Sequence, residues 1–439
     1  MTTELTTEPP WSPPRPGTGM SPNLRLNEIV TDRRRHGLDT LHLGFGEARL
    51  PLVPELEEVL AGAATDTAYA PVAGTPAARQ AVAGYFRRRR LPTHPAQVVL
   101  APGSKPLLFA VFTALGGDVY LPAPCWNSYA PQVALSGRTP VPVPIGGTYG
   151  GLPDPALLER RIEEDLRRGI RPAAIVVNSP DNPTGTSVPR EAMRELCRVA
   201  RDAGLTLVSD EIYRDLHHEG DDRFASPAEL APERTVVCTG LSKSLAIGGW
   251  RIGGARFPAG AFGAGLRDRT LAVASEVWSA LAAPMQAVAA YAFGEPPAIT
   301  ERLRRSARMH GSVSRACHEI CRSHGAAARR PTAGFYVYAD FEARRRDLAR
   351  HGAVDSASLA QVLLDRFGIA VLGGHHLGDD PRRLAFKMAT TGFVGETPEE
   401  QSAALDAAEA ADLPHVRRRL RWLDSALATL TAPPTDWTR

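Results

Sequence analysis

The sequence predicts an α/β fold in which helices cover a mainly parallel sheet. Short apolar segments at 173–177 and 205–208 are predicted strands, and a predicted helix at 190–203 joins them. This alternation of strand and helix is typical of a parallel sheet. Polar residues follow these strands directly, at the sheet edge where ligands bind in such folds. With 439 residues and a 43% hydrophobic composition, the chain is long enough for a large core and two domains.

Charge and composition argue against a nucleic-acid partner. The formal net charge is only +3. Runs of arginine occur at 87–90, 344–346 and 417–419, but they are scattered and acidic residues balance them overall. Such runs are typical of solvated helix faces. The chain has only three lysines, Lys105, Lys243 and Lys387, so each of them deserves inspection.

The termini and the cysteines indicate a cytoplasmic protein without a membrane anchor. No apolar segment approaches membrane-spanning length, and the N-terminus lacks the apolar run of a signal peptide. Residues 1–20 are rich in proline and are expected to form a flexible tail. Five cysteines are sparse, and Cys317 and Cys321 lack the second pair that a zinc site needs, so free thiols are expected.

The first third of the chain contains two candidate ligand loops. A helix is expected from Ser21, followed by a strand at 41–45 that ends in Gly44 and Gly46. This is half of a dinucleotide fingerprint without its third glycine, so NAD binding is not expected. A strand at 98–100 then leads to Ser104, which is the expected N-cap of a helix over 107–115. The start of that helix offers free N–H groups to a phosphate.

The segment 239–256 carries the strongest chemical signal. Lys243 stands between two serines, and Arg251 follows it among four glycines. A catalytic lysine needs desolvation or cationic neighbours, and an arginine can bind a phosphate with two donors. The pattern fits a lysine that holds pyridoxal phosphate (PLP) as an imine. A serine-rich loop with one surface lysine is the alternative.

These residues resemble the fold-type I PLP enzymes, in particular the aspartate-aminotransferase-like class I/II aminotransferases. The match rests on the spacing of five residues: Asn182, Asp210, Tyr213, Lys243 and Arg251. The resemblance implies that Asp210 pairs with the pyridine nitrogen and that Asn182 and Tyr213 bind the phenolic oxygen. Lys243 would form the imine and move the substrate proton, and Arg251 would bind the phosphate.

The resemblance also implies a PLP-dependent transferase fold of type I with a divided small domain. A large cofactor domain is expected over 54–306. A small α/β domain is expected from 21–53 together with 307–439. The resemblance covers nearly everything except the first twenty residues.

Further cofactor contacts follow from the same resemblance. Gly103, Ser104 and Lys105 would hold the phosphate, although Lys105 would equally suit the distal carboxylate of an acidic substrate. Trp126 would stack on the pyridine ring. The family commonly has Ser or Thr where this chain has Gly240, so Thr239 or Ser242 would have to replace that phosphate contact.

The substrate and the partner subunit would be contacted by four more positions. Gly46 and Asn182 would lie against the substrate carboxylate. Arg383, rather than the adjacent Arg382, would clamp that carboxylate from a small-domain strand. Tyr69 would reach the cofactor phosphate of the neighbouring subunit, which implies a homodimer with shared active sites.

The function implied is transfer of an amino group from an α-amino acid to a 2-oxo acid. The same residues would also serve elimination, γ-replacement or cyclisation in a biosynthetic pathway, because these reactions begin with the same α-carbanion. A paired-histidine loop at His375 and His376 lacks an evident third ligand, so no metal is expected there.

Overall fold

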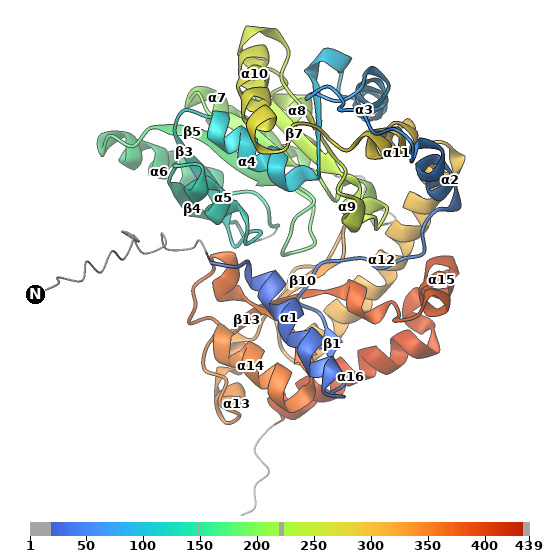
Figure 1. Cartoon of the computed structure of the whole chain (residues 1–439). Helices are drawn as coiled ribbons and strands as arrows, with labels where there is room; N and C mark the ends of the chain where they lie inside the picture. The colour runs from blue at the N-terminus through green and yellow to red at the C-terminus, as the bar shows by residue number, and fades with distance from the viewer. Residues whose placement is uncertain (1–18, 148, 219–223, 433–439) are drawn as a thin grey trace, which may run out of the picture.

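The computed structural model describes residues 19–147, 149–218 and 224–432, and these fold into two lobes that each carry a sheet (Figure 1). The larger lobe lies at the top of Figure 1 and the smaller one below it. The tail predicted for residues 1–20 lies outside the described residues except for Gly19 and Met20.

The large lobe is built on a seven-stranded sheet with the order β2-β8-β7-β6-β5-β3-β4. Its strands are β2 (Val98–Ala101), β3 (Asp118–Ala123), β4 (Pro140–Pro144), β5 (Pro172–Asn178), β6 (Thr206–Asp210), β7 (Thr235–Gly240) and β8 (Gly253–Arg256). Only β8 runs antiparallel to its neighbours. The predicted mainly parallel α/β sheet is confirmed.

Helices cover both faces of this sheet. They are α2 (Pro54–Ala63), α3 (Pro76–Arg88), α4 (Ser104–Ala114), α5 (Tyr129–Leu135), α6 (Pro155–Arg167), α7 (Arg190–Asp202), α8 (Pro227–Leu230), α9 (Leu241–Ser244), α10 (Gly260–Val277) and α11 (Ala283–Gly294). Adjacent β5 residues point to opposite faces. Val176 packs into the core beneath α4 and α10, while Val177 packs with α6 and α7. The continuous apolar sequence of β5 therefore reflects burial on both sides.

The small lobe is formed by segments from the N-terminal and the C-terminal parts of the chain. Its main sheet has the order β12-β13-β10-β9, formed by β9 (Ala327–Ala328), β10 (Tyr336–Asp340), β12 (Leu372–Gly373) and β13 (Ala385–Ala389). Near the N-terminus, β1 (Leu41–His42) pairs in parallel with β11 (Ile369–Ala370). The lobe's helices are α1 (Pro22–Arg35), α12 (Pro297–Ser323), α13 (Arg345–Ala349), α14 (Ser356–Phe367), α15 (Pro398–Asp406) and α16 (Pro414–Thr431). The expected boundary at 306/307 falls within α12, and the domain division stays a prediction.

Local sequence signals explain several helix ends. Thr75 and Asp154 accept hydrogen bonds from backbone N–H groups in the first turns of α3 and α6, and each is followed by proline. Gly368 ends α14 in the left-handed region at φ 66°. At α4 the expectation needs a correction. Gly103 occupies the N-cap position and Ser104 is already the first helical residue.

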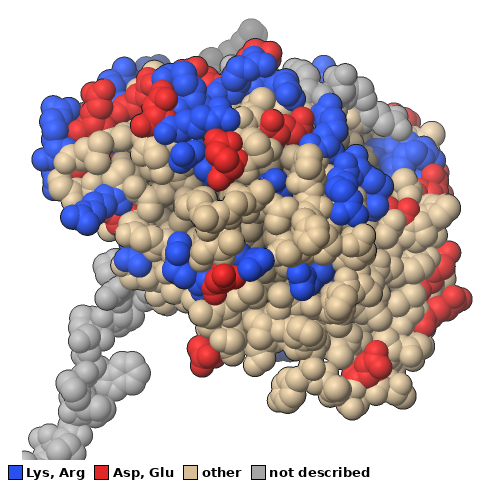
Figure 2. Space-filling model, turned by 90° about the horizontal axis from the view of Figure 1, so that it is seen from above, with Lys and Arg blue, Asp and Glu red and all other residues tan. Residues whose placement is uncertain are grey.

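The surface of the large lobe shows no segregation of charge on the face seen from above. Basic and acidic side chains lie interspersed there, and a broad area carries neither (Figure 2). Within the described ranges, no helix has both the length and the apolar character needed to cross a bilayer.

Candidate active site

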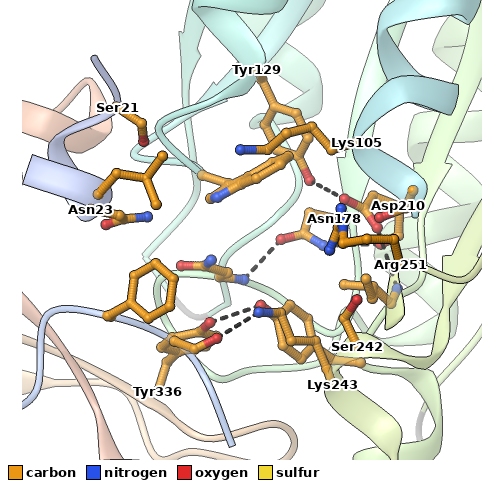
Figure 3. A pocket seen from close by; sticks show the side chains of 18 residues that line it. Ser21, Asn23, Lys105, Tyr129, Asn178, Asp210, Ser242, Lys243, Arg251 and Tyr336 are labelled. Atoms are coloured by element: carbon orange, nitrogen blue, oxygen red, sulfur yellow. Dashed lines mark hydrogen bonds between the residues drawn. The ribbon is translucent and has the colours of Figure 1, made fainter. Parts of the chain in front are cut away.

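A cavity of about 300 Å³ lies at the carboxyl ends of the large-sheet strands, where the two lobes meet. Its walls include predicted site residues that are far apart in sequence: Gly46, Ser104, Lys105, Trp126, Asn182, Asp210, Tyr213, Ser242, Lys243 and Arg251. Figure 3 shows that they converge from several strand ends. The structure therefore brings most of the predicted site together.

One end of the cavity is suited to a phosphate group. Helix α4 begins there without a side-chain cap, so its first N–H groups remain available to an anion. Gly103 adopts φ 95°, and a Cβ atom built on it would lie 2.4 Å from Nη2 of Arg251. Only glycine therefore lets the guanidinium of Arg251 approach the start of this helix.

The structure explains the departure at Gly240. A Cβ atom at this position would lie 2.9 Å from the backbone oxygen of Ile252, so the residue that precedes β8 leaves no room for Ser or Thr. Thr239 is buried beside Tyr85 rather than in the cavity wall. Ser242, in contrast, lines the cavity, as does Ser104 at the start of α4, so both offer a hydroxyl at this end.

Lys243 lies on the short helix α9, which directly follows strand β7. Its Nζ donates a hydrogen bond to the backbone oxygen of Gly46 at 2.5 Å. The pKa of Lys243 is lowered to about 8, mainly by burial. The charges of Arg251 and Lys105 also lower this pKa, whereas those of Glu47 and Asp210 raise it. The amine is therefore more easily deprotonated, and hence nucleophilic, than an exposed lysine.

Asp210 ends strand β6 as a buried carboxylate in the same cavity. Tyr129 donates its hydroxyl to Oδ2 at 2.8 Å, and the backbone N–H of Ile212 donates to Oδ1 at 3.3 Å. Burial raises the pKa of Asp210 to about 6 despite these hydrogen bonds. A cation next to this carboxylate would offset the cost of its burial.

Two tyrosines and an asparagine line the wall beside Lys243. The hydroxyls of Tyr213 and Tyr336 are 2.8 Å apart and share a hydrogen bond. Asn182 is held by Asn178, whose Oδ1 accepts its backbone N–H at 2.8 Å. A Cβ atom on Gly46 would lie 1.9 Å from the Tyr336 hydroxyl, so glycine is required where the chain crosses this wall.

The opposite side of the cavity is aromatic. Trp126 lines it and packs edge-to-face on Tyr129, with ring centroids 5.1 Å apart. Nζ of Lys105 lies 5.2 Å from the Trp126 ring centroid. Burial lowers the pKa of Lys105, and the charge of Arg251 lowers it further.

Several cavity residues were missed in the sequence. Ser21 and Asn23 at the start of α1 line the cavity, and both hydrogen-bond to the side chain of Asn127 in the large lobe. Tyr129 and Tyr336 also contribute. Tyr129 follows Trp126 by three residues, which is a usable signal. Nothing in the pattern around Ser21 and Tyr336 relates them to the strand-end loops.

Arg383 requires a correction, because the structure does not bring it to the cavity. Strand β13 begins at Ala385, so Arg383 precedes it. Its guanidinium forms an ion pair with Asp340 and lies 3.8 Å from Asp379. Its side chain is half exposed, and Arg382 is more exposed still. The predicted clamp is therefore engaged with protein carboxylates outside the site.

Tyr69, which is predicted to serve the neighbouring subunit, and the paired histidines His375 and His376 also lie outside this cavity. Tyr69 is 96% exposed. His375 and His376 have ring centroids 3.8 Å apart, and Nδ1 of His375 hydrogen-bonds to Ser356 at 2.7 Å. Among the residues that the structure describes, no group of three or more potential ligands could hold a metal ion.

The donor set fits PLP. An anion site stands at one end, the buried carboxylate of Asp210 accepts a hydrogen bond from Tyr129 on the aromatic side, and Lys243 lines the same space. These features match the phosphate, the ring nitrogen and the aldehyde of that molecule. Gly103 supports the fit, since a side chain there would displace Arg251.

Comparison with known proteins agrees with this geometry. The family model "Aminotransferase class I and II" matches residues 39–391. The aspartate/prephenate aminotransferase of Thermus thermophilus is 33% identical over 366 residues, which cover 81% of this chain and 88% of that protein. A probable aspartate/prephenate aminotransferase of Thermus aquaticus is 36% identical over 73% of this chain and 82% of its own length.

Solved structures show the same fold. Aspartate aminotransferase from Thermus thermophilus with maleate superposes with a TM-score of 0.76 at 29% identity, covering 89% of this chain and 96% of that one. A tetra mutant of the same enzyme, complexed with tryptophan, gives a TM-score of 0.73 at 28% identity, with 91% and 96% covered. The chain therefore belongs to the class I and II aminotransferases, is a PLP-dependent transferase of fold type I, and moves amino groups from amino acids to 2-oxo acids.

Proposed function

We propose that this aminotransferase holds PLP through Lys243 and accepts an acidic amino acid such as aspartate as amino donor. The observation that carries the proposal is the cavity itself, in which the buried amine of Lys243 and the buried carboxylate of Asp210 face one space beside an anion site. The names of the relatives, aspartate and aspartate/prephenate aminotransferase, support the substrate class. Lys105 in the cavity wall supplies a cation for a distal carboxylate.

Each residue's role follows from its position. Bound PLP supplies an electron sink for negative charge at the substrate's α carbon. Asp210 would keep the ring nitrogen protonated, because an adjacent carboxylate favours the cationic form. Tyr213 and Asn182 would donate to the phenolic oxygen. Lys243 would accept the substrate's α proton at Nζ, which its lowered pKa favours.

The remaining contacts orient the cofactor. Arg251, Ser242 and the first N–H groups of α4 would hold the phosphate, with Gly103 leaving space for the arginine. Trp126 would pack on the ring and exclude water from one face. Gly46 and Asn182 would lie against the substrate carboxylate.

We also propose a homodimer in the cytoplasm. Tyr69 is 96% exposed in its own chain, which leaves its ring and hydroxyl free to enter a neighbour's site. A buried tyrosine would instead be expected if it only packed a turn. All five cysteines, each in the described part of the chain, are free thiols, which supports a reducing compartment.

The test is a direct assignment of the PLP-bearing residue. Purified enzyme is reduced with borohydride and peptide-mapped, and the label is expected on Lys243 and absent from Lys243→Ala. A label on Lys105 or Lys387 would refute the assignment. Transfer of ¹⁵N from labelled aspartate to 2-oxoglutarate, followed by mass spectrometry, tests the reaction. Release of free ammonia, or a new C–C or C–N bond in the product, would favour elimination, replacement or cyclisation instead.

A further inference from the structure

Lys387 is a buried lysine to which the site described above assigns no role. It lies on β13, its side chain is fully buried, and its Nζ has no hydrogen-bond partner among the described residues. Its nearest aromatic contact is the Tyr336 ring, whose centroid lies 5.1 Å from Nζ. Burial of an ammonium group without a hydrogen-bond partner costs free energy, so we expect a bound ligand to supply the partner.

The alternation of β13 turns Lys387 toward the active site. Phe386 and Met388 point into the core of the small lobe, so Lys387 and Ala389 face the other side of the sheet. On that side lies Tyr336, which lines the active-site cavity. Lys387 therefore stands behind the tyrosine wall, on the small-lobe side of the cavity.

This side of the cavity needs a cation for an amino-acid substrate. Arg251 lies at the phosphate end, beside Gly103. Lys105 lies over Trp126 on the aromatic side. Arg383 is engaged with Asp340 outside the site. Only three of the chain's 51 Lys and Arg residues are lysines. Besides Lys105 and Lys243, the remaining one is Lys387.

We propose that Lys387 is the cation that pairs with the α-carboxylate of the amino-acid substrate, in the place where Arg383 was expected. The inference rests on the proposed function, because it takes the substrate to be an α-amino acid bound beside Lys243. The carboxylate would lie by Gly46 and Asn182. Entry of the anion would give the buried ammonium of Lys387 the partner that it lacks among the described residues.

A lysine in this role makes carboxylate binding depend on pH. Burial, with a smaller effect from the charge of Lys243 on α9, lowers the pKa of Lys387 to about 7. The other titratable groups near it are Tyr336 and Tyr338 on β10 and His42 on β1. Affinity for a carboxylate is therefore full below pH 7 and falls as pH rises, by about tenfold per pH unit for one linked proton. An arginine would stay charged throughout.

The test measures binding rather than turnover. The affinity of the PLP-loaded enzyme for maleate is measured by calorimetry between pH 6 and pH 9 in wild type, Lys387→Arg and Lys387→Met. Wild-type affinity should fall above neutral pH more steeply than that of Lys387→Arg, which controls for titration elsewhere in the site. Lys387→Met should lose at least tenfold in affinity at pH 6.5 while its PLP content and absorbance stay normal. Arg383→Met should bind maleate like wild type.

Outcomes that overturn the inference are distinct from failure of the proposed function. Equal pH profiles in wild type and Lys387→Arg, or undiminished maleate affinity in Lys387→Met, would overturn it. If the variants do not fold, a wild-type affinity that does not fall above pH 7 overturns it as well. A borohydride label away from Lys243 would instead refute the proposed function. As a second readout, Lys387→Met should lose its preference for alanine over ethylamine, which lacks the carboxylate.

Discussion

Replacement of Asp210 by asparagine should weaken catalysis and yet stabilise the cofactor-free protein at neutral pH. The carboxylate is buried, and its pKa rises from 3.8 to about 6. The native state therefore holds this proton more tightly than the unfolded chain does. The free energy of unfolding therefore decreases as pH rises from about 4 to about 6, and it stays at this lower level above pH 6.

The magnitude follows from the shift and from the hydrogen bonds. About two pKa units correspond to about 3 kcal/mol at pH 8. An asparagine Oδ1 can accept from Tyr129, but its amide then faces the N–H of Ile212, which costs about 1 kcal/mol. The net expectation for Asp210→Asn is a gain of about 2 kcal/mol at pH 8 and a loss of up to about 1 kcal/mol near pH 4.

The assay compares urea midpoints of the cofactor-free proteins from pH 4 to pH 8. Asp181→Asn is the matched control, because burial raises the pKa of Asp181 to about 7 although it does not line the cavity. Both variants should flatten the pH dependence of stability. With PLP, only Asp210→Asn should slow exchange of the substrate's α proton for deuterium, by about 10²–10³-fold. Parallel stability profiles in wild type and Asp210→Asn, or normal proton exchange, would refute the reasoning.

Three further changes probe other parts of the site. Tyr69→Phe should weaken the affinity for PLP. Mixing this variant with inactive Lys243→Ala should form hybrid dimers in which one site has wild-type PLP affinity. If the PLP affinity of the mixture stays at that of Tyr69→Phe, the sites are not shared. Gly46→Ala should lower the free energy of unfolding by about 1–3 kcal/mol, measured with urea, because its Cβ displaces Tyr336. If Gly46→Ala is as stable as the wild type, the side chain of Tyr336 can move aside without cost, which would contradict the argument. Lys105→Ala should reduce the kcat/KM preference for aspartate over alanine, whereas equal losses for both donors would exclude contact with the distal carboxylate.

The sequence was informative for those site residues that lie at or just after the end of a strand. Asp210 ends β6, and Lys243 comes three residues after β7, so an apolar run followed by a polar turn marked each of them. Because parallel strands present their carboxyl ends at one edge, these turns could be placed together without a structure. The fold class was predicted from the alternation of strand and helix and the PLP-dependent family from the spacing of five residues, and both are confirmed.

The small-lobe side of the cavity could not be predicted in the same way. Tyr336 and Ser21 reach it from segments on either side of the large lobe, and local patterns do not encode how the two lobes meet. The location of the Arg383 side chain depends on where β13 begins and on which carboxylates from other elements lie near it. Asp340 lies on the neighbouring strand, and its ion pair with Arg383 is visible only in three dimensions.

The pairing of β1 with β11 sets an order for folding during synthesis. Leu41 emerges from the ribosome early, but its partner Ile369 is made only after the whole large lobe. At roughly 10 residues per second the N-terminal segment waits on the order of half a minute for this partner. During that time Val30 of α1 lacks the cover that Leu364 and Ala370 later provide. We therefore expect the large lobe to fold first and nascent chains to leave Val30 of α1 uncovered until translation is nearly complete.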